Sequence, residues 1–280
     1  MPNYENHQQS SVVSNEVGRL ERKHKISIII PVYNEEAKIS IILSQIKQIL
    51  ADTQLEYEII IINDGSTDDT EKIVHEVKKS DAYIKLISYR DNMGKGHAVK
   101  LGVEESNGDV TLFLDGDLNV SPKEIKNYVK ELEGFDIAIA SKAHQLSRVE
   151  CTASRRFLSK AYNNLVRLVV GIKIRDTQSG LKIGNTSVLK NIFKIMLVEG
   201  YAFDVELLSI ATMEGLKIKE LPINVTLDSS FDVKEIAKMF IDTLGIAYRL
   251  RISKYYRKKI DESEKSSEFE SWDHRPTFLT

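Results

Sequence analysis

The chain has 280 residues, of which 42% are hydrophobic and 29% are charged, a balance typical of a folded globular protein rather than of a disordered one. Its 39 Lys and Arg against 41 Asp and Glu give a net charge of −2, so no global positive field attracts nucleic acid. The single cysteine, Cys151, excludes a disulfide framework and a multi-cysteine metal site, and it fits a reducing compartment.

The two ends of the chain differ in composition from its middle. Residues 1–24 are polar and without periodicity, which predicts a disordered arm that lacks the apolar core of a signal peptide. Residues 260–280 are polar and acidic and predict a disordered tail. No stretch approaches about 18 uncharged apolar residues, so no segment is expected to cross a membrane. We therefore expect one domain over residues 25–232 and an added helix over 233–259, in a cytoplasmic protein that can lie on a membrane surface.

Short apolar runs alternate with helical patterns in the first half of the chain, which predicts an α/β fold with a mainly parallel sheet. The apolar runs, which are typical of buried strands, span residues 26–30, 59–62, 85–89 and 110–114. Between the first two runs, apolar residues recur at helical spacing from Ile39 to Leu50. Asp68 followed by Glu71 predicts a capping box at the start of the next helix, and a third helix is expected over 97–106.

The second half of the chain carries weaker signals. The expected elements there are a strand over 136–141, a basic helix over 154–171, a strand over 218–227 and a long helix over 233–259. Together with the first half, they predict helices on both faces of a sheet and amphipathic helices toward the C-terminus.

Polar residues follow the strands, beyond the carboxyl ends where open parallel sheets bind their ligands. After the fourth run, Asp115 and Asp117 flank Gly116 and predict an oxygen-rich site for Mg²⁺ or Mn²⁺. A plain surface turn is the alternative, because Asp-Gly is common in turns, but the position after a buried strand favours the metal site. The glycine patterns of dinucleotide-binding and P-loop proteins are absent from the sequence.

The turns after the second and third runs offer groups that suit a nucleotide. Asn63 and Asp64 carry an amide and a carboxylate that can hold the edge of a nucleobase, although the same pair suits a turn and a helix cap. Lys95 lies between two glycines and can reach a phosphate; a solvated loop lysine is the alternative.

Seven motifs occur in a fixed order along most of the chain: PVYNEE, INDGS, GKGHAVKLG, Asp-x-Asp, ASKAH, RDTQSGLK and YAFDVELL. Together they resemble the inverting family 2 glycosyltransferases, in the branch that moves a sugar from a nucleotide onto a polyisoprenyl phosphate. The third, sixth and seventh motifs resemble the dolichyl-phosphate β-glucosyltransferases more than the dolichol-phosphate mannose synthases. The resemblance runs from about residue 26 to about residue 251.

The resemblance implies a GT-A fold, a Rossmann-like α/β arrangement, as the catalytic domain over residues 25–232. It also implies a nucleotide sugar across the ends of the first, second and fourth strands, with Asp115 and Asp117 around Mg²⁺ or Mn²⁺ and the diphosphate. The residues expected to bind the donor are Pro31, Tyr33, Glu35, Asn63, Asp64, Lys95 and Asp115. Two positions depart from the family pattern: Asn63 stands in place of Asp, and Lys142 in place of Arg, which keeps the charge but loses the planar fork.

A basic segment predicts the acceptor side. Residues 151–175 hold six Lys and Arg and no acidic residue, and their apolar residues recur at helical spacing. Such a helix can lie among lipid headgroups, where each Lys or Arg contributes about 1 kcal/mol, or it can pack on the core with a solvated basic face. Since the resemblance implies a lipid-phosphate acceptor here, the expected acceptor-binding residues are Lys142, Arg155, Arg156 and Ser159. Residues 234–259 are similarly basic and amphipathic, with eight Lys and Arg against Glu235 and Asp242, so we expect peripheral attachment to a membrane surface.

The expected reaction needs no general base on the acceptor. A phosphate monoester has a second pKa of about 6 and is already ionised, so positioning and charge stabilisation are expected to supply most of the rate. Gln178 offers an oxygen that would complete the metal shell or contact the sugar. Asp204 and Glu206 are further catalytic candidates, as a base, as sugar-orienting groups or as structural residues. The sequence leaves these roles open, because alternate residues share a face on a strand but not on a helix.

The leading hypothesis is a metal-dependent glycosyltransferase that moves a hexose, expected to be glucose from UDP-glucose, onto a polyisoprenyl phosphate with inversion. The alternatives are GDP-mannose or UDP-N-acetylglucosamine as the donor, a glycan hydroxyl as the acceptor, and an inactive GT-A domain that serves as a membrane-surface scaffold. No nucleic-acid partner is expected, and the sequence carries no signal for an oligomeric state.

Overall fold

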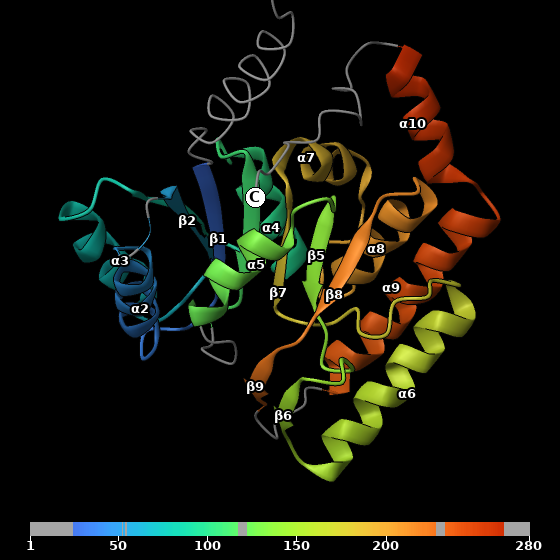
Figure 1. Cartoon of the computed structure of the whole chain (residues 1–280), viewed down its shortest axis with the longest axis horizontal. Coiled ribbons are helices and arrows are strands. Elements are labelled where there is room, and N and C mark those ends of the chain that lie inside the picture. The colour runs from blue at the N-terminus through green and yellow to red at the C-terminus, as the bar shows by residue number, and fades with distance from the viewer. Residues whose placement is uncertain (1–24, 52, 54, 117–121, 228–232, 266–280) are drawn as a thin grey trace, which may run out of the picture.

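A seven-stranded sheet in the order β3-β2-β1-β4-β7-β5-β8 forms the centre of the computed structural model (Figure 1). The structure describes residues 25–51, 53, 55–116, 122–227 and 233–265. The four neighbouring parallel strands are β1 (Lys25–Val32), β2 (Glu56–Asp64), β3 (Ile84–Tyr89) and β4 (Val110–Leu114). The other three are β5 (Ile137–Ala140), β7 (Leu181–Asn185) and β8 (Ile218–Leu221), of which β7 runs antiparallel to both neighbours. A separate parallel pair is formed by β6 (Arg148–Glu150) and β9 (Asn224–Thr226).

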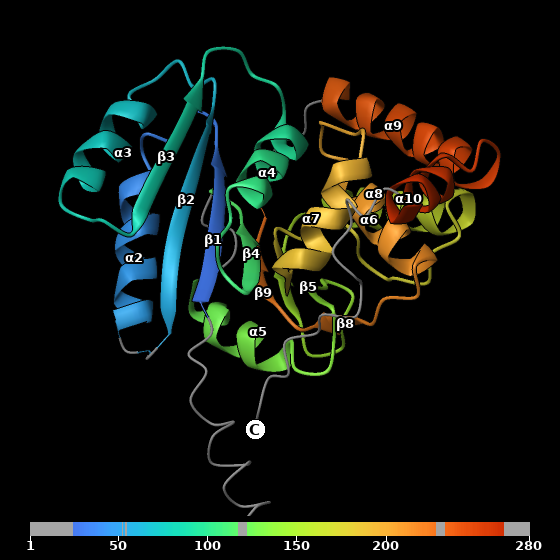
Figure 2. The same cartoon turned by 90° about the horizontal axis from the view of Figure 1, so that it is seen from above.

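Helices cover both faces of the sheet, which confirms the expected α/β fold (Figure 2). The helices on one face are α2 (Ile39–Ala51), α3 (Thr70–Lys79) and α5 (Ile125–Glu131), the last after a 3-10 turn (Pro122–Glu124). Those on the other face are α4 (Lys95–Glu104), α7 (Thr186–Ile195) and α8 (Phe203–Met213). Consecutive strand residues point to opposite faces, so Ile28 and Ile30 pack with the first group of helices and Ile29 with the second. The apolar runs at 26–30, 59–62 and 110–114 therefore belong to strands buried on both sides, whereas the run at 85–89 lies on the partly exposed edge strand β3.

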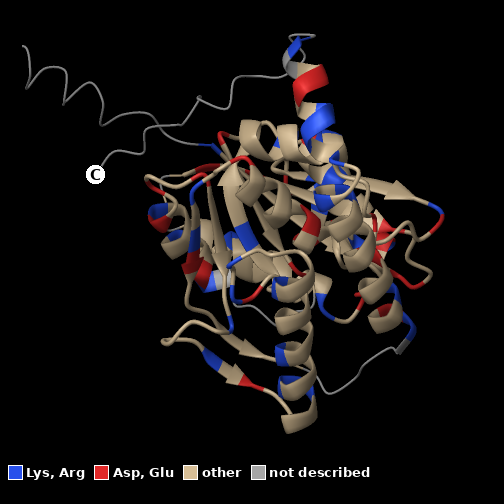
Figure 3. Cartoon of the chain, turned by 90° about the vertical axis from the view of Figure 1, so that its right-hand side faces the viewer, with Lys and Arg blue, Asp and Glu red and all other residues tan. Residues whose placement is uncertain are grey.

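An outer group of helices packs beside α7 and α8. Its members are α6 (Ala153–Val169), α9 (Val233–Arg251) and α10 (Tyr255–Lys265). Lys and Arg recur along α6, which has no acidic residue (Figure 3). Over the described part of the chain, no helix is both long and apolar enough to cross a bilayer.

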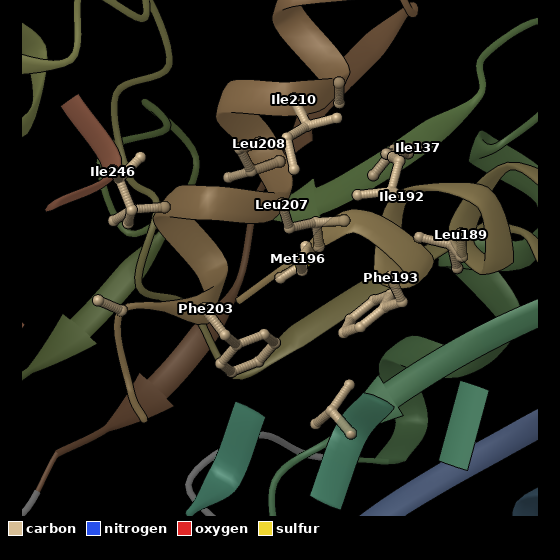
Figure 4. Close-up of a cluster of buried hydrophobic side chains, with 14 of the residues drawn as sticks. Ile137, Leu189, Ile192, Phe193, Met196, Phe203, Leu207, Leu208, Ile210 and Ile246 are labelled. Atoms are coloured by element: carbon tan, nitrogen blue, oxygen red, sulfur yellow. The ribbon is translucent and has the colours of Figure 1, made fainter. Parts of the chain in front are cut away.

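A buried apolar cluster joins these helices to the sheet. Figure 4 shows Phe193 of α7, Phe203 of α8 and Ile246 of α9 around it. The rings of Phe113 on β4 and Phe193 meet edge to face, with centroids 5.8 Å apart. Residues 203–211 of α8 are all buried, so this helix lies inside the domain and holds its polar side chains in the interior.

The expected single helix over 233–259 is wrong, because the chain forms two helices, α9 and α10. Lys254 has a φ of 52°, a left-handed conformation that separates them. Tyr256 and Ile260, four residues apart on α10, are buried against the core, which explains why the chain turns back and stays helical to residue 265. Residues 260–265 of the expected disordered tail are thus helical. The remainder of that tail and the expected arm over 1–24 lie outside the described residues.

Two prolines explain where strands differ from the expected ones. β1 continues past Pro31, because its ladder with β4 ends at Ile29 and only β2 pairs with the remainder. The expected strand over 218–227 is two strands, β8 and β9, on either side of Pro222. Proline lacks the N–H group that a continuous ladder needs.

The expected capping box at α3 is also wrong. Asp68 Oδ1 accepts bonds from the backbone N–H of Thr70 at 3.0 Å and from its hydroxyl at 2.5 Å. Glu71 turns instead toward Asn63, whose Nδ2 donates to its carboxylate at 3.3 Å. The loop after β1 completes the helix start, because the N–H of Glu35 donates to the Thr70 hydroxyl at 2.9 Å.

Candidate active site

Lys95 and Asp115 meet where β1, β4 and α4 come together. Asp115 directly follows β4, Lys95 is the first residue of α4, and their Nζ and Oδ1 atoms lie 2.5 Å apart with both side chains 22% exposed. Gly180 lies against the other side of this carboxylate, since a Cβ there would be 2.5 Å from Asp115 Cγ and closer still to Oδ2. Two residues expected at the donor phosphates are thus in contact. Asp117, the second expected metal ligand, lies outside the described residues.

The turn that precedes α4 is fixed from two sides. The carboxylate of Asp64, at the end of β2, accepts bonds from the N–H groups of Met93 at 2.7 Å and Gly94 at 3.0 Å. On the other side, the carbonyl of Glu199 accepts the N–H of His97 at 3.1 Å. Gly94 has a φ of 101°, and a Cβ there would lie 2.7 Å from the Glu199 oxygen, so only glycine fits. Asp64 therefore orders this turn, and its contact with a nucleobase stays a prediction.

A buried ion pair between Lys182 and Asp204 lies beside this contact. Lys182 Nζ is 2.8 Å from Asp204 Oδ1 and donates to the Ser179 carbonyl at 2.5 Å, and neither charged side chain is more than 7% exposed. One small cavity is lined by residues that include Lys95, Asp115, Gly180, Lys182 and Asp204. Burial raises the pKa of the Asp204 carboxyl and lowers the pKa of the Lys182 ammonium, while their mutual attraction opposes both shifts.

Lys182 lines the cavity of the candidate site but was not among the residues expected there. It lies inside β7, whose residues are all buried, and a buried ammonium requires a carboxylate nearby. A lysine within an apolar strand is the signal that could have identified it. Its partner Asp204 was expected at the site, and the structure places Asp204 there.

The nucleoside side of the expected site is formed by the loops after β1 and β2. Tyr33 is 47% exposed, and Pro31 lines the same small cavity as Asp115. Asn63 is buried and its Oδ1 accepts the N–H of Ser66 at 3.1 Å, so the residue that departs from the family pattern orders its own turn. The roles of these residues and of Glu35 in nucleotide binding stay predictions.

Lys142, two residues after β5, is tied to the loop before β7. Its Nζ is 3.0 Å from Asp176 Oδ2 and donates to the Gln178 carbonyl at 2.6 Å. The N–H groups of Lys142 and Gln178 donate to the same carboxylate at 2.8 and 3.2 Å. Burial alone would raise the pKa of Asp176, but Lys142 and these donors hold it below its ordinary value. The Gln178 amide donates to the carbonyl of Tyr201 at 3.1 Å, so this network reaches the loop before α8.

The remaining acceptor candidates lie in the first two turns of α6. Thr152 caps this helix by accepting the N–H of Arg155 at 3.3 Å, and the Arg156 guanidinium donates to the carbonyl of Val149 at 3.5 Å. Ser159 follows one turn later and is half-buried. The contact of these three residues with an acceptor phosphate stays a prediction.

The outer faces of α6 and α9 expose apolar side chains, which we call the outer rows. Their members are Phe157 and Leu168 on α6, Ile241, Leu244 and Tyr248 on α9, and Ile252 directly after α9. Each is at least 56% exposed, and the spacing places the members of each helix on one face. The two helices contact each other through Tyr162 and Thr243, whose hydroxyl oxygens lie 2.8 Å apart. Phe157 and Leu168 therefore face outward from α6.

Glu206 points away from the cavity that Asp204 lines. Asp204 and Glu206 are two positions apart in sequence, which on a helix is a rotation of about 200°, so their side chains leave α8 in different directions. Glu206 is fully buried, and the groups that donate to its carboxylate are the N–H groups of Leu197 (3.1 Å) and Val198 (2.7 Å), the Arg249 guanidinium (3.3 Å) and the Tyr256 hydroxyl. These contacts join the loop before α8 to α9 and α10. They favour the structural alternative for Glu206 over the catalytic one.

The groups around Asp115 fit a divalent cation that shares its coordination with a phosphate. Mg²⁺ usually takes one or two carboxylates and completes its shell with waters and substrate phosphates. The ammonium of Lys95 already lies against the carboxylate, so a positive charge is accommodated there. Within the described residues, no group of three or more His, Cys, Asp or Glu side chains forms a metal cage. Asp115 would therefore hold Mg²⁺ or Mn²⁺ together with the phosphates of a ligand.

Residues 27–193 match the model of glycosyl transferase family 2. A dolichyl-phosphate beta-glucosyltransferase of Trichomonas vaginalis is 34% identical over 241 residues, which cover 81% of this chain and 74% of that protein. The dolichyl-phosphate beta-glucosyltransferase of Mus musculus is 31% identical over 218 residues, which cover 72% and 67%.

Solved structures share the fold. Glucosyl-3-phosphoglycerate synthase from Mycobacterium tuberculosis, in complex with uridine-diphosphate, has a TM-score of 0.63 at 21% identity and covers 89% of this chain and 84% of its own. The same synthase, in complex with Mn²⁺, uridine-diphosphate and glucosyl-3-phosphoglycerate, has a TM-score of 0.62 at 20% identity, with 89% and 85% covered. At this identity the likeness shows the fold alone.

Proposed function

Since the chain belongs to glycosyl transferase family 2 and is a glycosyltransferase, we propose that it transfers glucose from UDP-glucose onto a dolichyl-type polyisoprenyl phosphate, with inversion and with Mg²⁺ or Mn²⁺. The contact of Lys95 with Asp115 carries the proposal, because it sets a cation suited to phosphate beside a carboxylate suited to a metal. The names of the two dolichyl-phosphate relatives support the donor sugar and the acceptor. The synthase that binds Mn²⁺ and uridine-diphosphate supports the metal.

The donor would lie across the ends of β1, β2 and β4. Lys95 would bind a phosphate oxygen, and the exposed ring of Tyr33 would lie at the nucleoside. Asp115, with Asp117, would hold the metal, which when bound supplies positive charge that stabilises the diphosphate as the glycosidic bond breaks. Asp204 is engaged by Lys182, so it would orient the sugar rather than accept a proton.

The acceptor phosphate would attack the anomeric carbon from the face opposite the diphosphate. One C–O bond forms as the other breaks, the anomeric configuration inverts, and the nucleoside diphosphate leaves with the bonding electrons. Because the phosphate is already ionised, no protein group has to remove a proton from it. Lys142, held by Asp176 and Gln178, would offset its negative charge.

We further propose that the outer rows rest on the cytoplasmic surface of a membrane, where the lipid phosphate is found. Apolar side chains that recur on one face of a basic helix are typical of helices that lie in the headgroup layer. The basic residues of α6, with no acidic residue among them, suit anionic lipid. A single cysteine fits the reducing side of the membrane.

The reaction is tested with the purified full chain and three donors: UDP-glucose, UDP-N-acetylglucosamine and GDP-mannose. Each is supplied with Mg²⁺, Mn²⁺ or EDTA, with and without a short polyprenyl phosphate, and nucleoside diphosphate release is measured. We expect turnover of UDP-glucose that requires both the lipid phosphate and the metal, with a β-linked product by NMR. Asp115→Asn should abolish it, whereas Asp261→Asn, an exposed substitution on α10, should leave it unchanged.

Other outcomes separate the alternatives. Turnover of another donor, or transfer onto a glycan without the lipid phosphate, would replace the proposed substrates. No turnover with any donor, from a folded chain that still binds lipid vesicles, would favour the scaffold.

Membrane attachment is tested by cosedimentation with vesicles that contain phosphatidylglycerol. A buried Ile contributes about 1.5 to 3 kcal/mol, so Ile241→Ser with Ile252→Ser, both partly shielded already, should weaken binding by about 2 kcal/mol, roughly thirtyfold. Ile41→Ser with Tyr83→Ser removes two exposed apolar side chains away from the outer rows and serves as the control. A wild-type chain that stays in the supernatant would contradict the proposal.

A further inference from the structure

We infer that Lys95 is an exchangeable counter-ion of Asp115, which a divalent cation and a nucleotide diphosphate displace together. The inference rests on the proposed function, since it concerns the binding of these two ligands at the same site. The inference also states how the two ligands affect each other. The cation and the diphosphate each bind weakly alone, and Lys95 makes their binding cooperative.

The cavity beside β4 holds two ion pairs of different character. Lys95, Asp115, Lys182 and Asp204 line it together with apolar side chains, so two positive and two negative charges balance in a small, partly apolar space. The pair of Lys182 with Asp204 is buried and is fixed further by the Ser179 carbonyl. The pair of Lys95 with Asp115 is 22% exposed on both sides. The second pair is therefore the one that can open to a ligand from solvent.

Among the described residues, Lys95 and Gly180 flank the two oxygens of the Asp115 carboxylate. The ammonium lies 2.5 Å from Oδ1, while Gly180 lies against the side of Oδ2. A divalent cation that arrives alone must separate this ion pair and remain close to the displaced ammonium, and both effects oppose binding. A diphosphate that arrives alone must draw Lys95 away and leave the carboxylate of Asp115 without a counter-ion in a partly buried site, which is also costly.

When both ligands arrive, each charge finds a new partner. Asp115 then binds the metal and Lys95 binds a phosphate oxygen, so neither charge is left without an opposite charge beside it. Binding of one ligand therefore favours the other, and thermodynamic linkage requires the effect to be equal in both directions. A lysine that only binds phosphate, without competing for Asp115, would have no effect on the affinity for the metal alone.

The test is titration of Mn²⁺ into the full chain without nucleotide, followed by the EPR signal of free Mn²⁺, and titration of UDP by calorimetry with and without Mn²⁺. Lys95→Met removes the competing charge and keeps much of the side-chain length. We expect it to tighten Mn²⁺ binding without UDP by about tenfold, the usual size of such couplings, and to weaken UDP binding. Lys100→Met, on the same helix and also half-buried, is the matched control and should bind both ligands as the wild type does.

The outcomes separate the inference from the proposed function. Unchanged or weaker Mn²⁺ binding by Lys95→Met would overturn the inference. The proposed function would still stand if the wild type binds UDP with Mn²⁺ and Asp115→Asn abolishes that binding. A folded wild-type chain that binds neither ligand would overturn both. Thermal unfolding of each variant shows that the compared chains are folded.

Discussion

Gly180 is the position where the smallest substitution tests the geometry of the site. Ala adds one methyl group, whose carbon would lie 2.5 Å from Asp115 Cγ and 3.2 Å from its Cβ. The φ of Gly180 lies outside the left-handed region, so any strain comes from this contact and not from the backbone. An ordinary van der Waals contact begins at 3.4 Å, which requires the carboxylate to move by about 1 Å.

A shift of that size separates Asp115 from Lys95, whose charged atoms lie 2.5 Å apart. Misplacement of a reacting group by about 1 Å can cost roughly a hundredfold in rate. We therefore expect Gly180→Ala to lower kcat/KM for UDP-glucose by about a hundredfold, or about 2.7 kcal/mol, and to lower the free energy of unfolding by about 1 to 3 kcal/mol. Steady-state release of UDP and urea unfolding measure the two effects.

Gly134→Ala is the matched control. Gly134 has a φ of 74° and no heavy atom within 4 Å of the position of an added Cβ, so Ala strains the backbone without touching a neighbour. It should lower the free energy of unfolding by about 1 to 2 kcal/mol and leave kcat/KM unchanged. A Gly180→Ala variant with the kcat/KM of the wild type would refute the view that Gly180 positions Asp115.

Three further variants test buried groups by urea unfolding. The folded-state pKa of Asp176 lies below its unfolded value, so its stabilising effect is full above about pH 4 and is lost as the pH falls through the folded-state value. Asp176→Asn should therefore lower the free energy of unfolding by about 3 kcal/mol at pH 7 and by less at pH 3; an equal loss at both would contradict this. Lys182→Met leaves the Asp204 carboxylate buried without its cation and should lower the free energy of unfolding by about 3 to 5 kcal/mol. Adding Asp204→Leu to the same chain should restore part of this loss. If the effects of the two substitutions simply add, the two residues are not coupled. Tyr256→Phe removes one donor from the buried carboxylate on α8 and should cost about 1 to 2 kcal/mol, whereas wild-type stability would mean that water replaces the hydroxyl.

The central strands could be predicted from the sequence because helices cover them on both faces, which leaves continuous apolar runs. β7 and α8 could not be predicted in this way. β7 contains the buried Lys182, whose charge is compensated by the carboxylate of Asp204, a residue of the later helix α8. Residues 203–211 are all buried, so α8 lacks the polar face that gives a helix its period. In both cases the interaction that decides the structure lies outside any local window of sequence.

The site could be predicted residue by residue but not as an arrangement. Asp115 and Lys95 were identified from their places after strands, yet their contact depends on how α4 meets β4. Asp64 was expected at a nucleobase, which stays a prediction, and no sequence pattern indicated that its carboxylate also holds the turn at residues 93–94. The contacts between side chains of different loops depend on how the strands bring those loops together. A motif therefore indicates which functional groups are present, and the tertiary structure determines which of them are in contact.

The first turn of α8 connects the cavity with α9, which carries one of the outer rows. Asp204 and Glu206 both lie in this turn, where the positive end of the helix dipole favours a carboxylate, and each has its own cation. Lys182 comes from the sheet and Arg249 comes from α9. A movement of α9 that broke its bond to Glu206 would leave a fully buried carboxylate short of a partner, at a cost of several kcal/mol. This bond ties α9, with the outer row that it carries, to the first turn of α8, so a membrane that held α9 would also orient the cavity toward a lipid phosphate.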